Sequence, residues 1–188
     1  SAGSSTCTRC PRTPWLARKL LSASAGGAVL SMVTDSEALR RIAEGPDGIL
    51  AGLKPGTVWA DMSTVSPAVT RAMGAAVTAR GAAFLDTPVS GSAVTVEQGK
   101  RAFLVGGDAA ALERVRPYLL AIGASITHMG PLGMAVTMKV ALNLGIGVQL
   151  TAYAETVLLA EKAGISRERA VEAFLRSVLA SPMLQYRS

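Results

Sequence analysis

One lysine stands alone in the most apolar stretch of the chain. Lys139 lies within residues 130–143 (GPLGMAVTMKVALN), a glycine-containing turn that leads into a predicted long helix. Ala135 and Asn143 lie one turn before and after it, so the three side chains share one helix face. Burial would lower the pKa of this amine and let it exchange protons near neutral pH. On spacing alone, snorkelling of the lysine to the surface is the more common outcome.

Three hydroxyl-containing segments follow predicted strands. In an open parallel sheet, ligands bind beyond the carboxyl ends of the strands. The segments are 34–36 (TDS), 61–67 (DMSTVSP) and 86–92 (DTPVSGS). The second opens a helix whose first amides could face an anion, and the Ser-Gly-Ser turn of the third suits a carboxylate. Helix capping and ordinary turn chemistry explain the same residues nearly as well.

The elements that must position these segments alternate between strand and helix. Short apolar runs are separated by glycine, proline and capping residues, such as a capping box from Thr34 to Glu37 and an N-cap at Ser66. Predicted strands cover residues 28–33, 57–61, 83–86, 101–105 and 125–129, and predicted helices end near residues 44, 80 and 120. This alternation predicts an α/β fold with a partial Rossmann-type, mostly parallel sheet.

From Gly130 onwards the pattern is entirely helical. One helix should run to about Lys162, and a second, capped by Ser166, to about residue 179. The charge-free part, 140–154, is shorter than the roughly 20 residues that a membrane span needs. We therefore expect a core helix, which a second subunit could bury further.

The chain is accordingly divided into three parts. Residues 1–25 form a leader without clear periodicity, residues 26–130 a partial dinucleotide-binding domain, and residues 131–188 an incomplete, all-α C-terminal domain.

Charge and composition argue against nucleic acid as a partner. The net charge is +6, but four basic residues precede the first acid, and aromatic residues make up only 4% of the chain. The basic character is therefore concentrated near the start of the chain, and base-stacking side chains are few.

Cysteine and histidine are too few for a metal site. Cys7 and Cys10 form a CxxC pair without a second ligand pair, and His128 is the single histidine. A zinc site would need two such pairs. We expect no metal, two incidental thiols, a structural histidine and a cytoplasmic location.

Several motifs, taken in order, resemble one known family. They are VLSMVTDSE (29–37), GLKPG (52–56), DMSTVSP (61–67), DTPVSGS (86–92), VGGD (105–108), the segment 130–143 and AEKAGI (160–165). Together they resemble the β-hydroxyacid dehydrogenases. The resemblance runs from about Gly27 to the end of the chain.

The resemblance implies a role for each of these segments. Lys139 corresponds to the catalytic lysine, which exchanges a proton with the substrate hydroxyl or carbonyl. The implied reaction transfers a hydride between NAD or NADP and a small hydroxy acid or semialdehyde, in a protein that is a homo-oligomer. The substrate-binding positions are Ser90, Gly91, Ser92 and Asn143, and the cofactor-binding positions are Met32, Val33, Thr34, Ser36, Ser63 and Thr64.

The chain also departs from the family pattern. The first strands and the glycine-rich dinucleotide turn have no counterpart in residues 1–25, and Ser92 stands where a second glycine is usual. Two other interpretations therefore remain open. One is a non-catalytic or degenerate fragment that keeps the dimerising helical half. The other is an imine reductase, against which Lys139 argues.

Overall fold

A computed structural model describes residues 27–91, 101–181 and 184. The expected leader, its two cysteines and Ser92 lie outside these residues. The chain divides into two compact units, residues 1–139 and 140–188, and the division falls inside the longest helix.

The first unit is built on one sheet with the strand order β1-β2-β3-β5-β4, and β6 also pairs with β5. The pairs β1–β2, β2–β3 and β5–β6 are parallel, whereas β5 runs antiparallel to β3 and β4. The mostly parallel α/β fold is thus confirmed. The strands are β1 (Ala28–Ser31), β2 (Val58–Asp61), β3 (Ala83–Asp86), β4 (Val89–Ser90), β5 (Ala102–Gly106) and β6 (Ser125–Gly130).

Strands β3 and β4 follow one line along β5. Asp86 pairs with Gly106, Val89 with Phe103 and Ser90 with Ala102, so the register does not shift between the two strands. Pro88 lies between them and has no N–H to donate to the ladder, yet its carbonyl accepts a hydrogen bond from the Leu104 amide at 3.2 Å. Proline therefore interrupts the hydrogen bonding without changing the strand direction.

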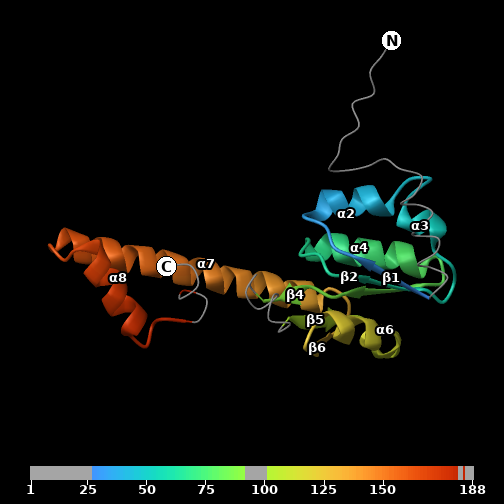
Figure 1. Cartoon of the computed structure of the whole chain (residues 1–188). Coiled ribbons are helices and arrows are strands. Elements are labelled where there is room, and N and C mark those ends of the chain that lie inside the picture. Colours follow the sequence, from blue (N-terminus) through green and yellow to red (C-terminus); the bar gives the residue numbers. More distant parts are fainter. Residues whose placement is uncertain (1–26, 92–100, 182–183, 185–188) are drawn as a thin grey trace, which may run out of the picture. The chain divides into compact units, whose positions relative to one another are not determined.

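Helices cover both faces of this sheet (Figure 1). Helices α2 (Ser36–Ala43), α3 (Ile49–Gly52) and α4 (Pro67–Thr78) pack on one face, and α6 (Ala109–Ile122) packs on the other. Alternation along β2 explains the two cores, because Trp59 enters the first and Val58 and Ala60 enter the second. Trp59 packs edge-to-face on Phe84 of β3, with ring centroids 5.0 Å apart.

Three local features differ from the sequence prediction. Asp35, not Thr34, is the N-cap of α2, and its side chain accepts from the Ala38 amide at 2.8 Å. A carboxylate caps at least as well as a threonine hydroxyl, which explains the one-residue shift. The short elements α3 and β4 were not expected, since four and two residues are too few to show a period.

The second unit contains most of α7 (Met134–Lys162) and α8 (Arg167–Arg176). Within it, Tyr153 packs on Phe174 with centroids 4.8 Å apart, and Arg167 makes two 3.0 Å hydrogen bonds to Glu161. Ser166 caps α8, as predicted.

The expectation of a core helix is wrong for the chain by itself. Only 11% of the most apolar window of α7 is buried, and large side chains such as Leu144, Val148 and Leu159 are exposed. The sequence showed correctly that α7 is apolar on all sides, but not what would cover it. Of the described helices, α7 is the one long and apolar enough to cross a membrane, which is weak support for a span.

Gly74 offers a test of how tightly α4 packs. A Cβ at this position would overlap the Leu132 side chain and lie 3.7 Å from the Phe84 ring. Alanine normally stabilises a helix over glycine by about 0.5–1 kcal/mol, but overpacking costs about 1–3 kcal/mol. We therefore expect Gly74→Ala to gain less free energy of unfolding in a urea titration than the helix preference alone would give, because the Leu132 side chain must move aside.

The exposed neighbour Ala75 gives a reference value for the alanine-over-glycine preference in α4. Ala75→Gly should cost only the helix preference of that position. If Gly74→Ala stabilised the chain by as much as Ala75→Gly destabilises it, the close packing on Leu132 would be refuted.

Candidate active site

A row of polar residues crosses the sheet where β1, β2 and β3 end. Ser31 pairs with Asp61 and Asp61 with Asp86, so the three lie side by side on neighbouring strands, and Gly106 of β5 pairs with Asp86. Both aspartates are 2% exposed. A buried carboxylate is costly unless it is hydrogen-bonded, so both side chains need donors inside the protein.

Asp86 attaches the long helix α7 to the sheet. Its Oδ1 accepts from the Gly133 amide and its Oδ2 from the Val136 amide, both at 2.8 Å. These amides belong to the turn before α7 and to its first turn, where N–H groups have no partner within the helix. The carboxylate also interacts favourably with the positive end of the helix dipole.

Gly106 is required beside this carboxylate. A Cβ at Gly106 would overlap the Asp86 carboxylate, whose Cγ lies 2.9 Å from that position. The VGGD motif thus leaves room for the side chain that orients α7.

Lys139 lies in the second turn of the helix that Asp86 attaches, and it is half-buried. Burial lowers the pKa of its ammonium group, because the charged form loses solvation. The direction of this shift agrees with the proton-exchange role inferred from the sequence.

Asp61 is the centre of a separate buried network. Its Oδ1 accepts from the hydroxyls of Ser31 and Ser63, both at 2.7 Å. Burial raises the pKa of the Asp61 carboxyl, and the hydrogen bonds from Ser31 and Ser63 oppose the rise. The nearby charge of Asp86 raises it further.

The residues predicted to bind the cofactor lie on the loops after β1 and β2, except Ser36, which is the first residue of α2. Met32 is 65% exposed, Thr34 is exposed, and Val33, Ser36 and Thr64 are partly buried. Ser63 differs from them, because it is 2% exposed and its hydroxyl is engaged within the protein.

The residues predicted to bind the substrate are only partly brought together. Ser90 is half-buried in β4, and Gly91 follows it, exposed, with a φ of 148° that favours glycine. Ser92 lies outside the described residues. Asn143 is exposed on α7 one turn beyond Lys139, as the sequence predicted, but it belongs to the second unit.

Other sequence features do not join this site. His128 Nε2 lies 2.8 Å from the Gly107 carbonyl, as expected of a structural histidine. No group of three His, Cys, Asp or Glu side chains in the described ranges could hold a metal ion.

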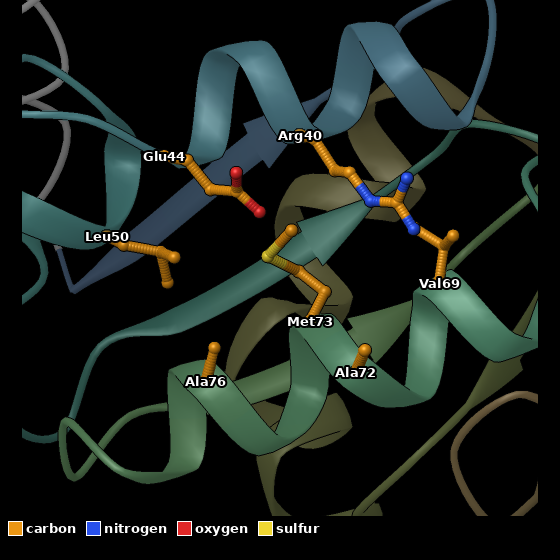
Figure 2. Close-up of a pocket in the computed structure, with 7 residues that line it drawn as sticks. All are labelled: Arg40, Glu44, Leu50, Val69, Ala72, Met73 and Ala76. Atoms are coloured by element: carbon orange, nitrogen blue, oxygen red, sulfur yellow. The ribbon is translucent and has the colours of Figure 1, made fainter.

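A surface pocket lies between α2 and α4, with Leu50 of α3 also in its lining. Figure 2 shows its lining side chains, with Met73 at the centre and the charged Arg40 and Glu44 on α2 and at its end. None of the predicted site residues contributes to it.

Sequence reasoning did not recognise the roles of Asp61 and Asp86. Both were placed at strand ends, but neither was assigned a function. A signal was available, because each aspartate directly follows an apolar strand predicted to be buried. A carboxylate in that position must find donors inside the protein.

The sheet, with its loops beyond the carboxyl ends of the strands, is that of a Rossmann-type nucleotide-binding protein. Comparison with known sequences agrees with this class. The family described as the NAD binding domain of 6-phosphogluconate dehydrogenase matches residues 15–130, a range that begins within the expected leader.

Individual relatives are dehydrogenases and reductases. The chain is 38% identical over 149 residues to an NAD-dependent L-serine dehydrogenase of Pseudomonas aeruginosa, covering 79% of this chain and 50% of the relative. It is 32% identical to 2-hydroxy-3-oxopropionate reductase of Escherichia coli, covering 90% and 57% of the two chains. Among solved structures, 3-hydroxyisobutyrate dehydrogenase from Salmonella typhimurium matches with a TM-score of 0.76 and 30% identity, covering 93% and 66%.

The chain therefore belongs to the family with the NAD-binding domain of 6-phosphogluconate dehydrogenase. The relatives named above are β-hydroxyacid dehydrogenases and reductases to which it is similar. It spans about half the length of the curated relatives it matches.

Both carboxylate oxygens of Asp86 accept hydrogen bonds from backbone amides. Substitution by asparagine should therefore lower the stability of the fold. Asp86→Asn would turn one acceptor into an N–H donor that faces a backbone amide of α7. Leaving a buried polar group unpaired costs about 1–3 kcal/mol, so we expect a loss of this size in the free energy of unfolding.

Asp108→Asn is the matched control, because Asp108 caps α6 through one recorded hydrogen bond, from the Ala111 amide to Oδ1. Asparagine caps a helix about as well as aspartate. Equal losses in the two variants would contradict the special role of Asp86.

The lowered pKa of Lys139 predicts a defined pH dependence. The folded state releases this proton at lower pH than the unfolded chain, where a lysine titrates near ~10.4. Between the two pKa values the unfolded state binds more protons, so this group makes stability rise with pH in that alkaline window.

Lys139→Met should remove this rise, whereas Lys54→Met, at an exposed turn, should leave it. Urea titrations across the alkaline range measure it directly. An identical pH dependence in Lys139→Met and the unchanged chain would show that the amine is fully solvated.

Proposed function

We propose that this chain is part of an NAD(P)-dependent oxidoreductase of the 3-hydroxyacid dehydrogenase type. The observation that carries the proposal is Lys139. Its pKa is lowered by burial, and it lies in the second turn of a helix that a buried carboxylate attaches to the carboxyl end of the sheet. The names of the relatives support the same chemistry.

The cofactor, NAD or NADP, is proposed to lie against the two loops that follow β1 and β2. Exposed Met32 offers an apolar surface, and Thr34, Ser36 and Thr64 offer hydroxyls. This mixture suits a nicotinamide ring and its ribose, which are recognised by apolar contact and hydroxyl hydrogen bonds. Asp35 caps α2 with a carboxylate, which disfavours a phosphate at that helix start.

The substrate is proposed to be a small hydroxy acid or semialdehyde. The Ser90 hydroxyl and the Gly91 backbone, together with Ser92, would hold its carboxylate, and Asn143 would help to orient it. When bound, the nicotinamide supplies or accepts the hydride. Lys139 Nζ takes the hydroxyl proton during oxidation and returns a proton to the carbonyl oxygen during reduction, which requires an amine that is neutral part of the time.

We further propose that the protein is a homo-oligomer in the cytoplasm, with no membrane span and no nucleic-acid partner. The exposed apolar surface of α7, which includes Val140, Leu144 and Val148, supports the oligomer alone. Contiguous apolar patches of this kind usually mark an interaction surface. A monomer in light scattering would refute the oligomer.

The decisive test is a fluorescence titration of the chain with NADH and NADPH, followed by turnover assays with L-serine, 2-hydroxy-3-oxopropionate and 3-hydroxyisobutyrate. Lys139→Ala should lower turnover by about 10²-fold or more, because general acid–base catalysis contributes about that much. Cofactor affinity should be unaffected.

Lys162→Ala, at the far end of the same helix, is the control and should retain full turnover. Undiminished turnover in Lys139→Ala would exclude the lysine mechanism. Failure of both cofactors to bind would exclude cofactor binding by this chain.

A further inference from the structure

The two loops proposed to hold the cofactor are joined through one buried hydroxyl. Ser63, in the loop after β2, accepts a hydrogen bond from the Val33 amide, in the loop after β1, at 2.8 Å. The same hydroxyl donates to Asp61 Oδ1 at 2.7 Å. The Val33 amide is flanked by Met32 and Thr34, two of the residues proposed to face the cofactor.

A second serine makes the mirror-image arrangement toward the core. The Ser31 hydroxyl accepts from Trp59 Nε1 at 2.8 Å and donates to Asp61 Oδ1 at 2.7 Å. A serine hydroxyl has a single proton. Because each oxygen already accepts from an N–H, each proton is left to point at the same carboxylate oxygen.

Asp61 therefore determines which way both hydroxyls point. An ionised carboxylate can only accept hydrogen bonds. Both serine hydroxyls must therefore donate to Asp61. With the proton of Ser63 held by Asp61, a lone pair of its oxygen is directed at the Val33 amide. Through Ser63, the buried carboxylate on β2 thus fixes the position of the loop after β1.

Other contacts between the loops are consistent with this arrangement. The Met62 amide donates to the Ser31 carbonyl at 2.7 Å, and the Ser66 amide donates to the Ser36 hydroxyl at 3.1 Å. The first of these involves only backbone atoms and does not depend on Asp61. It gives an internal reference for the strand ends themselves.

We propose that Asp61 is a positioning residue, which acts through the Ser63 hydroxyl to hold the Val33 segment in the conformation that binds the nicotinamide cofactor. This inference rests on the proposed function, because it deepens the assignment of these loops to the cofactor. It also changes the expected role of Ser63 from direct contact with the cofactor to support of the loop that makes the contact.

The chain offers a matched pair of variants. Ser63→Ala and Ser31→Ala each remove one buried hydroxyl from Asp61 Oδ1, but only Ser63 is bonded to Val33. Amide hydrogen exchange of the full chain, read by NMR, compares Val33 with the Met62 reference. A titration with NADH and NADPH measures the dissociation constant for each variant.

In Ser63→Ala we expect exchange at Val33 to accelerate about tenfold relative to Met62, and the cofactor dissociation constant to rise about tenfold, as for the loss of one hydrogen bond. Ser31→Ala should leave both values within about twofold while lowering the free energy of unfolding, since Trp59 loses its acceptor. If the network had only a structural role, Val33 exchange and the cofactor dissociation constant would change by similar factors in the two variants.

Two variants of Asp61 test the carboxylate itself. Asp61→Ala should reproduce both effects of Ser63→Ala, because the Ser63 proton is then free to turn toward other acceptors. Asp61→Asn keeps a carbonyl oxygen at this position and should restore the protection of Val33 at least in part.

The proposal is overturned if Val33 exchanges equally fast in Ser63→Ala and Ser31→Ala, or if Asp61→Ala leaves Val33 protected. It is also overturned if Val33 is released but cofactor affinity does not change. If the unchanged chain binds neither cofactor, the proposed function fails for this chain. Slow amide exchange at Val33 that depends on Asp61 and Ser63 would then show that the hydrogen-bond network holds the loop but has no role in cofactor binding.

Discussion

The structure of the first unit depends on a carboxylate with two backbone amides. Asp86 ends β3 and receives the N–H groups of Gly133 and Val136, so the sheet and the start of α7 are held by one buried side chain. The buried side chains of Ala135 and Val136 add packing at the same helix start. The position of Lys139 relative to the sheet follows from the Asp86 contact and from the room that Gly106 leaves beside it.

Burying two carboxylates on neighbouring strands costs free energy unless each is hydrogen-bonded. The two aspartates have different sets of donors. Asp86 accepts hydrogen bonds from the amides of a helix start, whereas Asp61 accepts them from serine hydroxyls. Burial raises the pKa of Asp61, and the charge of Asp86 adds to the rise. Polar groups that a sheet would normally keep at its surface are thus buried where the proposed ligand contacts begin, and they fix the loops on either side.

Strand and helix positions followed from the sequence because they rest on local chemistry. The run from Ala83 to Asp86 was predicted with its observed bounds, and Ser66 and Ser166 cap helices as their spacing indicated. The antiparallel pairing of β5 could not be predicted, since nothing local records which strand lies alongside. The exposure of α7 was missed for the same reason, because an apolar helix does not specify its neighbours. The roles of Asp61 and Ser63 depend on contacts between loops thirty residues apart.

The unshifted register from Asp86 to Ser90 has a mechanical consequence for the edge of the sheet. Four residues of extended chain span about 13 Å, and the intervening Pro88 keeps its own backbone stiff. The residue that attaches α7 and the hydroxyl proposed to hold a carboxylate are therefore the two ends of one rigid rod. A shift of Asp86 along β5 would therefore carry Ser90 with it, so the attachment of α7 and the position of this hydroxyl are coupled through the backbone.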